Sequence, residues 1–538
     1  MRINKSTLLF TLLGGVFSSA LAAQSADSIR WRNITYMRQS EAWLSSENAA
    51  GLHALSIPHL STAEVYANKQ NGDFVNYYQS NNSFEFGAQV ESFYRFNPKI
   101  VFYGKVDYRN FSGKHMTGSV FIHPENTPFD IVEYSDENRG DKELENYHLA
   151  GAVSANLSEK IIIGGKVDYT AANYAKQKDL RHVNKLLDMY VTAGIIYRLN
   201  SKLELGANYY YRRSTEGLFM DTYGTTDKVY NSLISYGGFF GVVEQFGENG
   251  YTKENEEKPL FNEYHGGTLQ VKWRILPKLR FFNEFAYKSR SGYYGKKSPS
   301  TVVYSEHDAD ILSYSGTLSL QERNNLHNLH VHFSQEALNS FENIYRYDNE
   351  GGGLGNVGYY GTLDTTDKTV RKLDAGYTGN FRVTDGCPAW VAKGIFSYFS
   401  RTLTASVYPY YRKQDLHNLT FQLSGERNIC REKDMYSLYL GGAYTSGGGD
   451  IYKDGTYATP TESQTAPRSM EAYLYREYEF LTCKQVKGNA GFRYAHTIGR
   501  KGMKGYTSIH YSLTKAFNTE YLTGDMHHEI AWTLGCTF

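Results

Sequence analysis

Apolar and polar side chains alternate at every second position through most of this chain. In residues 84–96 the apolar positions Phe84, Phe86 and Val90 are interleaved with Glu85 and Glu91. Successive side chains of a β-strand point to opposite sides, so a period of two gives a strand one apolar and one polar face. The same pattern recurs in residues 100–108, 187–199, 269–275, 372–383, 418–424 and 527–538.

The connections between these strands distinguish a membrane barrel from a soluble sandwich, whose strands also alternate. Short and long connections take turns along the chain, and tight turns at one rim with long loops at the other are typical of outer-membrane barrels. The short turns are expected at residues 97–100, 158–161, 200–203, 276–279, 323–325, 385–388, 428–434 and 482–485. The long connections are expected at residues 113–143, 217–262, 292–310, 348–367 and 447–468.

The turn pattern predicts an all-β fold, a transmembrane antiparallel outer-membrane β-barrel with short periplasmic turns and long extracellular loops. Eight short turns, with both chain ends at their rim, give about 18 strands of the ~9–11 residues that cross a membrane. Barrels of 14 or 16 strands stay open, because residues 408–417 and 500–526 are hard to assign. Closure is needed because every backbone donor and acceptor in hydrocarbon must be paired.

The N-terminus has the features of a secretory signal peptide. Arg2 and Lys5 precede an apolar stretch at residues 8–17, and small residues follow up to Ala23. This apolar stretch is too short for a membrane anchor. The sequence predicts a signal peptide at 1–23, an N-terminal segment at 24–59 and a barrel at 60–538, located in the outer membrane of a Gram-negative bacterium.

Composition excludes two other classes of protein. The 57 Lys and Arg residues balance 56 Asp and Glu residues, so no basic footprint for nucleic acid exists. Aromatic residues make up 15% of the chain and include 47 Tyr, which is not the composition of a disordered protein. The tyrosines near strand ends are expected to form interfacial girdles, with sugar-binding platforms on the loops as the alternative.

Charged residues on the polar faces are candidates for the lining of an aqueous pore. Mixed charges hydrate a channel and select solutes by size and local field. The alternative is internal packing, in which cross-strand ion pairs fill the lumen and stabilise the wall. The pore-lining candidates are Glu85, Glu91, Arg95, Lys105, Asp107, Arg109, Lys166, Asp168, Arg212, Lys272, Arg274, Lys372, Asp374 and Arg382, to which Arg280 and Glu284 are added.

The segment before the barrel does not alternate cleanly and is expected to be either a hatch in the lumen or a flexible periplasmic tail. Its residues 46–52, Ser-Glu-Asn-Ala-Ala-Gly-Leu, resemble the Asn-Pro/Ala-Ala-Gly stretch near the start of fatty-acid-transporter-type barrels, where this segment lies in the lumen. The resemblance implies a hatch role for Trp43, Asn48, Gly51 and Leu52.

The whole chain resembles a family of uncharacterised outer-membrane barrels of Bacteroidota. The shared features are the signal peptide, an early Trp followed by Asn-Ala-Ala-Gly-Leu, Tyr-rich strands and a terminal Phe. That family has no established activity, so the resemblance implies a fold and a location. The last strand, with Trp532 and the C-terminal Phe538, also resembles the signal that the barrel-assembly machinery reads, which makes that machinery an expected partner.

Four cysteines are placed at one rim by the predicted topology. Cys387, Cys430 and Cys483 fall in three successive short turns, and Cys536 lies two residues from the C-terminus. The topology predicts disulfides Cys387–Cys430 and Cys483–Cys536 in the oxidising periplasm. Other pairings, free thiols or a metal site remain alternatives.

No motif in the chain indicates an enzyme or a cofactor. His330 and His332 share a face and could ligate a metal, but alternating strand residues are more often a polar wall; His527 and His528 project to opposite faces. The glycine runs at 351–353 and 447–449 lack the Lys-Ser/Thr of a phosphate-binding loop. We therefore expect no catalytic residues, no metal and no cofactor.

The sequence predicts a channel or uptake component for small solutes, with a lumen that is either open or plugged by the N-terminal segment. One alternative is a hatch-containing transporter of hydrophobic molecules, which predicts an apolar pocket against the hatch. Others are a non-transporting scaffold or secretion-system partner and, last, a barrel enzyme. The expected partners are outer-membrane lipid, the barrel-assembly machinery and a small solute, and nucleic acid is not among them.

Overall fold

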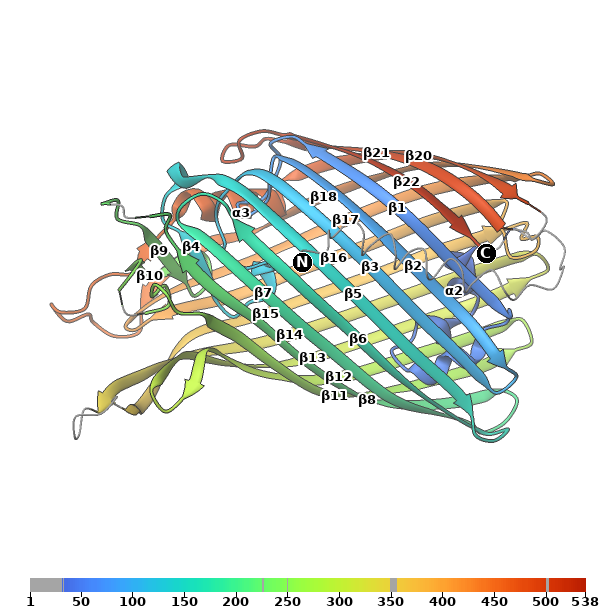
Figure 1. Ribbon diagram of the computed structural model, residues 1–538, viewed down its shortest axis with the longest axis horizontal. Helices are drawn as coiled ribbons and strands as arrows, with labels where there is room; N and C mark the ends of the chain where they lie inside the picture. The colour runs from blue at the N-terminus through green and yellow to red at the C-terminus, as the bar shows by residue number, and fades with distance from the viewer. Residues whose placement is uncertain (1–30, 32, 225–226, 249, 349–355, 500–502) are drawn as a thin grey trace, which may run out of the picture.

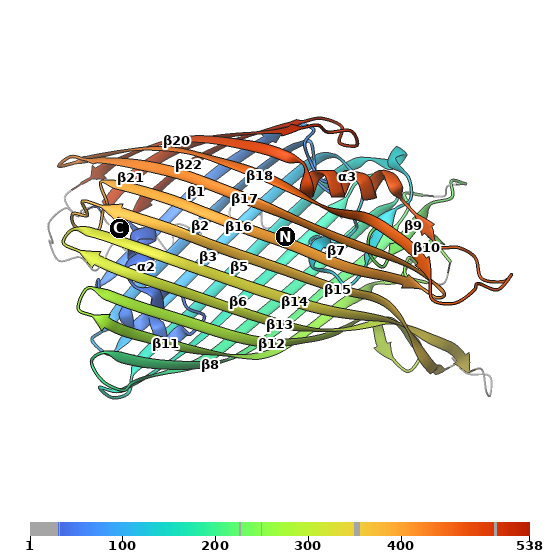
Figure 2. The ribbon, with the colours of Figure 1, turned by 180° about the vertical axis from the view of Figure 1, so that it is seen from behind.

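Eighteen strands of the computed structural model form one antiparallel sheet that closes on itself (Figures 1 and 2). Closure occurs because the first strand, β1, pairs with β2 on one side and with the last strand, β22, on the other. The structure describes residues 31, 33–224, 227–248, 250–348, 356–499 and 503–538. The predicted signal peptide lies outside these residues.

The barrel strands follow the chain in order, and each pairs with the next one along the sheet. They are β1 His59–Asn71, β2 Asn82–Asn97, β3 Ile100–Met116, β5 Gly140–Asn156, β6 Ile161–Lys176, β7 Arg181–Arg198, β8 Leu203–Asp221, β11 Lys258–Leu276, β12 Leu279–Ser298, β13 Thr301–Glu322, β14 Asn325–Asp348, β15 Asn356–Phe381, β16 Trp390–Val407, β17 Tyr410–Cys430, β18 Asp434–Thr456, β20 Lys484–Ile498, β21 Met503–Phe517 and β22 Met526–Thr537.

Both ends of the barrel chain meet at the rim of short turns. The backbone N–H and C=O of Phe538 each pair with Ser61, at 2.9 Å, beside the start of β1. The 18-strand prediction, with short turns at one rim and the chain ends beside them, is confirmed.

The outward face of the sheet is apolar. Leu423 and Leu440, on neighbouring strands, have 73% and 68% of their surface exposed. Such a band of exposed leucines and aromatics is stable only against lipid. The protein is a β-barrel of the Gram-negative outer membrane. Among the described helices, none is long and apolar enough to cross a membrane.

Three predicted connections are wrong, and one of them is the long connection at residues 348–367, because β15 already begins at Asn356. Residues 292–310 do not form a long loop, because β12 and β13 extend to Ser298 and Thr301 and leave a two-residue turn. Residues 482–485 are not a short turn, because helix α3, Glu471–Thr482, ends there at the rim of long loops and β20 begins. The last connection at the rim of short turns instead lies between β20, which ends at Ile498, and β21, which begins at Met503.

Further elements occupy the two ends of the barrel. Near the rim of short turns lie α2 (Ile34–Ser40) and the 3-10 helices η1 (Ala42–Ser45) and η2 (Ala49–Ala54), inside the cylinder in Figure 1. At the other end, loops form a small sheet, and α3 lies beside it (Figure 2). The strands of the small sheet, in spatial order, are β19 (Arg468–Ser469), β10 (Phe240–Gln245), β9 (Asn231–Ser235) and β4 (Asp130–Glu133). The nearby 3-10 helices are η3 (Pro124–Asn126) and η4 (Asp136–Asn138).

Candidate functional site

The N-terminal segment, residues 33–57, is held against the inner wall by Asn48. Its side-chain Oδ1 accepts a hydrogen bond from the N–H of Ala50 at 3.0 Å and so caps η2. Its Nδ2 donates to the backbone carbonyls of Ile195 and Ala207, at 3.1 and 3.2 Å, and to Gln270 at 3.1 Å. One amide therefore starts the helical turn and joins it to strands β7, β8 and β11.

Three inward-facing glycines on adjacent strands make room for this contact. A Cβ on Gly164 of β6 would lie 2.2 Å from the backbone N of Ala50, and one on Gly194 of β7 would lie 2.1 Å from Asn48 Oδ1. A Cβ on Gly206 of β8 would lie 2.7 Å from the ring of Trp43. Gly164 and Gly194 are direct partners across the two strands. This glycine cradle was not predicted from the sequence, although glycine inside a strand signals a close backbone approach.

The other hatch candidates lie at the same contact. Trp43 is 1% exposed, packs edge-on against Phe282 at 5.0 Å and donates its Nε1–H to Glu204 at 2.6 Å. Leu52 packs in a cluster that includes Phe93 on the wall. Gly51 is required because a Cβ there would lie 2.4 Å from the carbonyl oxygen of Trp43.

Ion pairs hold the segment from several sides. Glu41 pairs with Lys272 at 2.7 Å and with Arg280 at 3.7 Å, and Glu47 pairs with Lys288 at 2.7 Å. Further contacts join Arg38 to Glu91, Ser46 to Glu284, and Arg95 to the carbonyls of His53 and Leu55. On strands β14 and β15, Asn328 and Asn380 both donate to Gln39, at 2.8 and 2.9 Å.

Most of the remaining predicted pore-lining residues have partners within the wall. Arg212 pairs with Asp188 at 2.7 Å, and Asp168 contacts Lys166 at 2.9 Å and His148 at 2.7 Å. Arg109 lies 3.9 Å from Glu85, and Asp374 accepts from Ser397. Lys105, Asp107 and Lys372 also lie on strands of the wall, on the faces predicted to be polar. The lumen is thus lined by charges that are largely paired.

Two of the candidates lie away from the middle of the lumen. Arg382 follows the end of β15 and sits in a short turn with a positive φ of 52°, so its prediction as a wall residue is wrong. Arg274 is exposed near the same rim, at an irregularity in the pairing of β11 with β12. The alternation that placed them in the lumen stops where the strands bend into turns.

The four-stranded loop sheet, together with the residues 117–139 that lead into it, forms what we call the cap at the other end of the barrel. Buried side chains cover both of its faces: Ile131 and Ile234 belong to one apolar cluster, Val132 and Leu233 to another. Arg412 of β17 ties it to the wall, donating to Ser469 Oγ at 2.7 Å and to the carbonyl of Gly238 at 3.1 Å.

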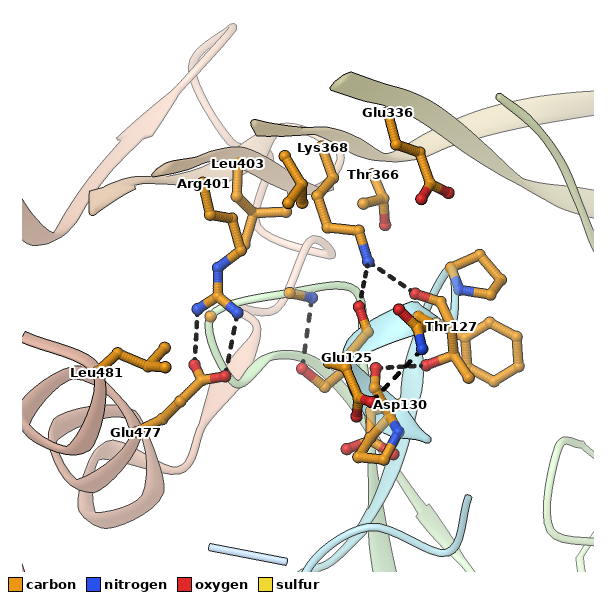
Figure 3. Close-up of a pocket in the computed structure, with 18 of the residues that line it drawn as sticks. Glu125, Thr127, Asp130, Glu336, Thr366, Lys368, Arg401, Leu403, Glu477 and Leu481 are labelled. Atoms are coloured by element: carbon orange, nitrogen blue, oxygen red, sulfur yellow. Dashed lines mark hydrogen bonds and ion pairs between the residues drawn. The ribbon is translucent and has the colours of Figure 1, made fainter. Parts of the chain in front are cut away.

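A cavity of about 450 Å³ lies under the cap, bounded by strands β13–β17 and by α3 (Figure 3). Arg401 points from β16 to Glu477 of α3 and forms two hydrogen bonds with it, at 3.0 and 2.7 Å. Lys368 points from β15 to the loop and donates to the carbonyl of Thr127 at 2.8 Å. The cavity thus lies where the wall, the cap and α3 meet.

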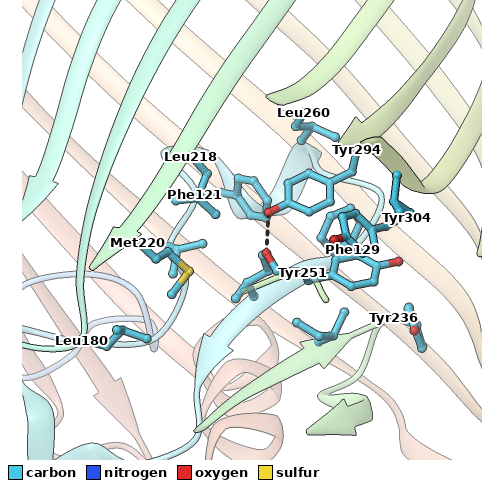
Figure 4. Packing of buried hydrophobic residues seen from close by; sticks show 14 of the residues in the cluster. Phe121, Phe129, Leu180, Leu218, Met220, Tyr236, Tyr251, Leu260, Tyr294 and Tyr304 are labelled. Carbon is cyan, nitrogen blue, oxygen red and sulfur yellow. Dashed lines mark hydrogen bonds between the residues drawn. The ribbon is translucent and has the colours of Figure 1, made fainter. Parts of the chain in front are cut away.

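An aromatic core fixes the cap on the side of β8, β11 and β12 (Figure 4). Phe129 packs edge-on against Tyr251 and Tyr294 at 5.2 and 5.1 Å, and the Tyr294 hydroxyl donates to the carbonyl of Tyr251 at 3.0 Å. Leu218 and Leu260 of the wall belong to the same cluster. Burial of this many rings holds the cap firmly, because each large apolar side chain contributes about 1.5–3 kcal/mol.

The cysteines occupy both rims. The sulfurs of Cys387 and Cys430 lie 3.4 Å apart in neighbouring short turns as free thiols, and their disulfide remains a prediction. The prediction of Cys483–Cys536 is wrong, because Cys483 precedes β20 at the rim of long loops and packs near Phe74. Cys536 pairs with Ala63 near the other rim. The predicted turn at residues 482–485 is in fact the end of α3 and the start of β20, which places Cys483 at the rim of long loops.

Side chains that could bind a metal are dispersed in the part of the chain that the structure describes. No three His, Cys, Asp or Glu residues there gather closely enough to hold an ion. His332 contacts Ser315 Oγ at 2.8 Å, as part of a polar wall. Trp532 faces outward and donates its Nε1–H to Thr507 at 3.0 Å, and its role in barrel assembly, with that of Phe538, remains a prediction.

A family model matches residues 49–538, which include the end of the N-terminal segment and the whole barrel. The chain belongs to the DUF6850 family, a family of unknown function. No curated protein matches this DUF6850 chain.

Solved outer-membrane proteins overlap with this DUF6850 barrel loosely. The Escherichia coli transporter YddB has 7% identity and a TM-score of 0.40, with 89% of this chain and 81% of that one covered. The ferric preacinetobactin receptor BauA of Acinetobacter baumannii has 8% identity and a TM-score of 0.38, with 90% and 80% covered. The Pseudomonas putida toluene transporter TodX has 8% identity and a TM-score of 0.28, with 95% and 99% covered.

Proposed function

We propose that this protein is a gated uptake channel for small polar solutes, closed at the periplasmic end by residues 33–57 and at the outer end by the cap. A barrel of this width has an aqueous lumen unless something fills it. The observation that carries the proposal is the seat of Asn48 and Ala50 on the Gly164–Gly194 pair, where the wall lacks side chains at the place where the segment lies.

The polarity of the interior favours a polar solute over a hydrophobic one. A cavity of about 350 Å³ borders the N-terminal segment, and its lining mixes Arg38, Glu47 and Lys166 with Leu52 and Phe93. A hydrophobic transporter would need an apolar pocket at this place. The charges instead support a hydrated path.

Planar-bilayer conductance of four proteins tests the proposal. Gly164→Val should unseat the segment, because the added atoms overlap the backbone of Ala50. Ile234→Asp should loosen the cap, since it puts a charge into a core where Ile234 is 1% exposed. Two closures in series predict that the wild type and each single variant stay closed, and that the double variant conducts.

Matched controls separate gating from general damage. Gly165→Val changes the neighbouring residue, whose Cβ would meet only the Thr192 carbonyl at 3.7 Å, and Val242→Asp changes an exposed position of the cap, 40% accessible. Gly165→Val combined with Ile234→Asp, and Val242→Asp combined with Gly164→Val, should therefore stay closed. The proposal would be rejected if the wild type conducted steadily. It would also be rejected if the double variant formed a heat-resistant folded barrel but did not conduct.

A further inference from the structure

We infer that the cavity under the cap binds a small organic carboxylate with an apolar body, held by Lys368 and Lys372. This inference rests on the proposed function and names the class of solute. The cavity volume of about 450 Å³ is within the range of small-molecule sites, which is ~300–1,000 Å³. Figure 3 shows Lys368 reaching into the cavity from the wall.

The carboxylates that line the cavity are engaged by other groups. Glu477 accepts hydrogen bonds from both terminal guanidinium nitrogens of Arg401, and Glu336 accepts from Arg290 at 2.9 Å. Asp130 accepts from the hydroxyls of Tyr77, at 2.9 Å, and Ser119. The fourth, Glu125, contacts His123 at 3.6 Å and feels the charge of Lys372.

The two lysines have no carboxylate within ion-pair distance among the described residues. Lys368 donates to backbone carbonyls, those of Thr127 at 2.8 Å and Glu125 at 3.5 Å. Lys372 lies four residues along the same strand and on the same face. At ~3.3 Å per residue, its backbone position is about 13 Å from that of Lys368. An ammonium group that lines a cavity without a carboxylate in ion-pair contact is free to bind an anion, and a charge-assisted bond to it is stronger than a neutral one.

Part of the cavity lining is apolar. Leu403 of β16 and Leu481 of α3 line it, and Phe399 and Val370 add to its wall side. A fully hydrated inorganic anion would leave these groups facing water. A carboxylate attached to a ring or a branched chain satisfies the lysines and covers the apolar groups at once.

Equilibrium binding of benzoate to the purified full-length protein tests the inference, with calorimetry as the readout. We expect saturable binding by the wild type and at least a ~10-fold loss of affinity in Lys368→Gln and in Lys372→Gln, since each removes a charge-assisted bond. Benzamide, which has the same ring without the charge, and benzylamine, which has the opposite charge, should bind at least ~10-fold more weakly. Lys487→Gln, a lysine on β20 outside the cavity, should leave benzoate binding unchanged.

Three results would overturn the inference: no benzoate binding by a folded wild type, equal binding of benzamide, or full affinity in the Lys368→Gln/Lys372→Gln double variant. Each is independent of conductance. Binding without conductance in the four-protein test would reject the gated channel and leave the anion site. Conductance of the double variant without benzoate binding by the wild type would reject the anion site and leave the gated channel.

Discussion

Asn48 shows how a single polar residue couples a local structure to a distant wall. Its side-chain oxygen replaces a missing helical acceptor, and its side-chain NH2 group donates to backbone carbonyls of two strands. The contact exists only because Gly194 has no side chain to occupy the same place. The residue and the glycine therefore act as a pair.

At the same scale, we predict that Cys387 and Cys430 form a disulfide in the mature protein. Their sulfurs are 3.4 Å apart, in turns that face an oxidising compartment. Alkylation before and after reduction, read by mass spectrometry, should show two free thiols, Cys483 and Cys536, and one bonded pair. Removing the bond with Cys430→Ser should lower the thermal midpoint, because a loop of this size contributes about 3–4 kcal/mol in the chain-entropy model. Four alkylated thiols without reduction would contradict this.

At the scale of elements, the cap depends on a buried carboxyl group outside the membrane-spanning strands. Burial raises the pKa of Asp130 to about 7, against the lowering effect of its hydrogen bonds from Ser119 and Tyr77. Burial likewise raises the pKa of Glu244 on β10 to about 7. Between pH ~4 and ~7 the folded cap binds protons that the unfolded chain does not. The stability of the cap should therefore be highest at low pH and fall as pH rises through this window.

Hydrogen exchange of residues 117–134 and 231–245, corrected for the intrinsic rate at each pH, measures that stability. Protection should be greater at pH 5 than at pH 7.5 in the wild type. Asp130→Asn and Glu244→Gln should each reduce the difference, and the double variant should nearly remove it. If protection in the double variant still changed with pH as much as in the wild type, other groups would be the cause of the pH dependence.

The sequence predicted some elements well and others badly, for physical reasons. Barrel strands have one face in lipid, so their alternation is long and regular, as in residues 187–199. The cap strands are buried on both faces, so Ile131-Val132 and Leu233-Ile234 carry no alternation and were missed. The glycine cradle depends on the register between strands, which a single chain does not reveal. The α3 helix was missed because the turn signal at residues 482–485 was read as a hairpin.

At the scale of the whole molecule, the charges in the lumen serve the segment that occupies it. Lys272, Arg280 and Lys288 lie on two neighbouring strands and meet Glu41 and Glu47 of the segment. Besides the apolar packing of Trp43 and Leu52, the closure is held by ion pairs and amide contacts, whose groups regain hydrogen bonds to water when the segment separates from its wall. This is the property that a gate requires.

Hydrogen exchange of residues 33–57 in lipid nanodiscs shows whether this segment is seated inside the barrel. Its helical turns are too short to protect amides in water, so protection has to come from the wall. We expect slow exchange over residues 42–55 in the wild type and in Gly165→Val, and fast exchange in Gly164→Val with the strands still protected. Fast exchange of these residues in the wild type, within a protected barrel, would contradict it.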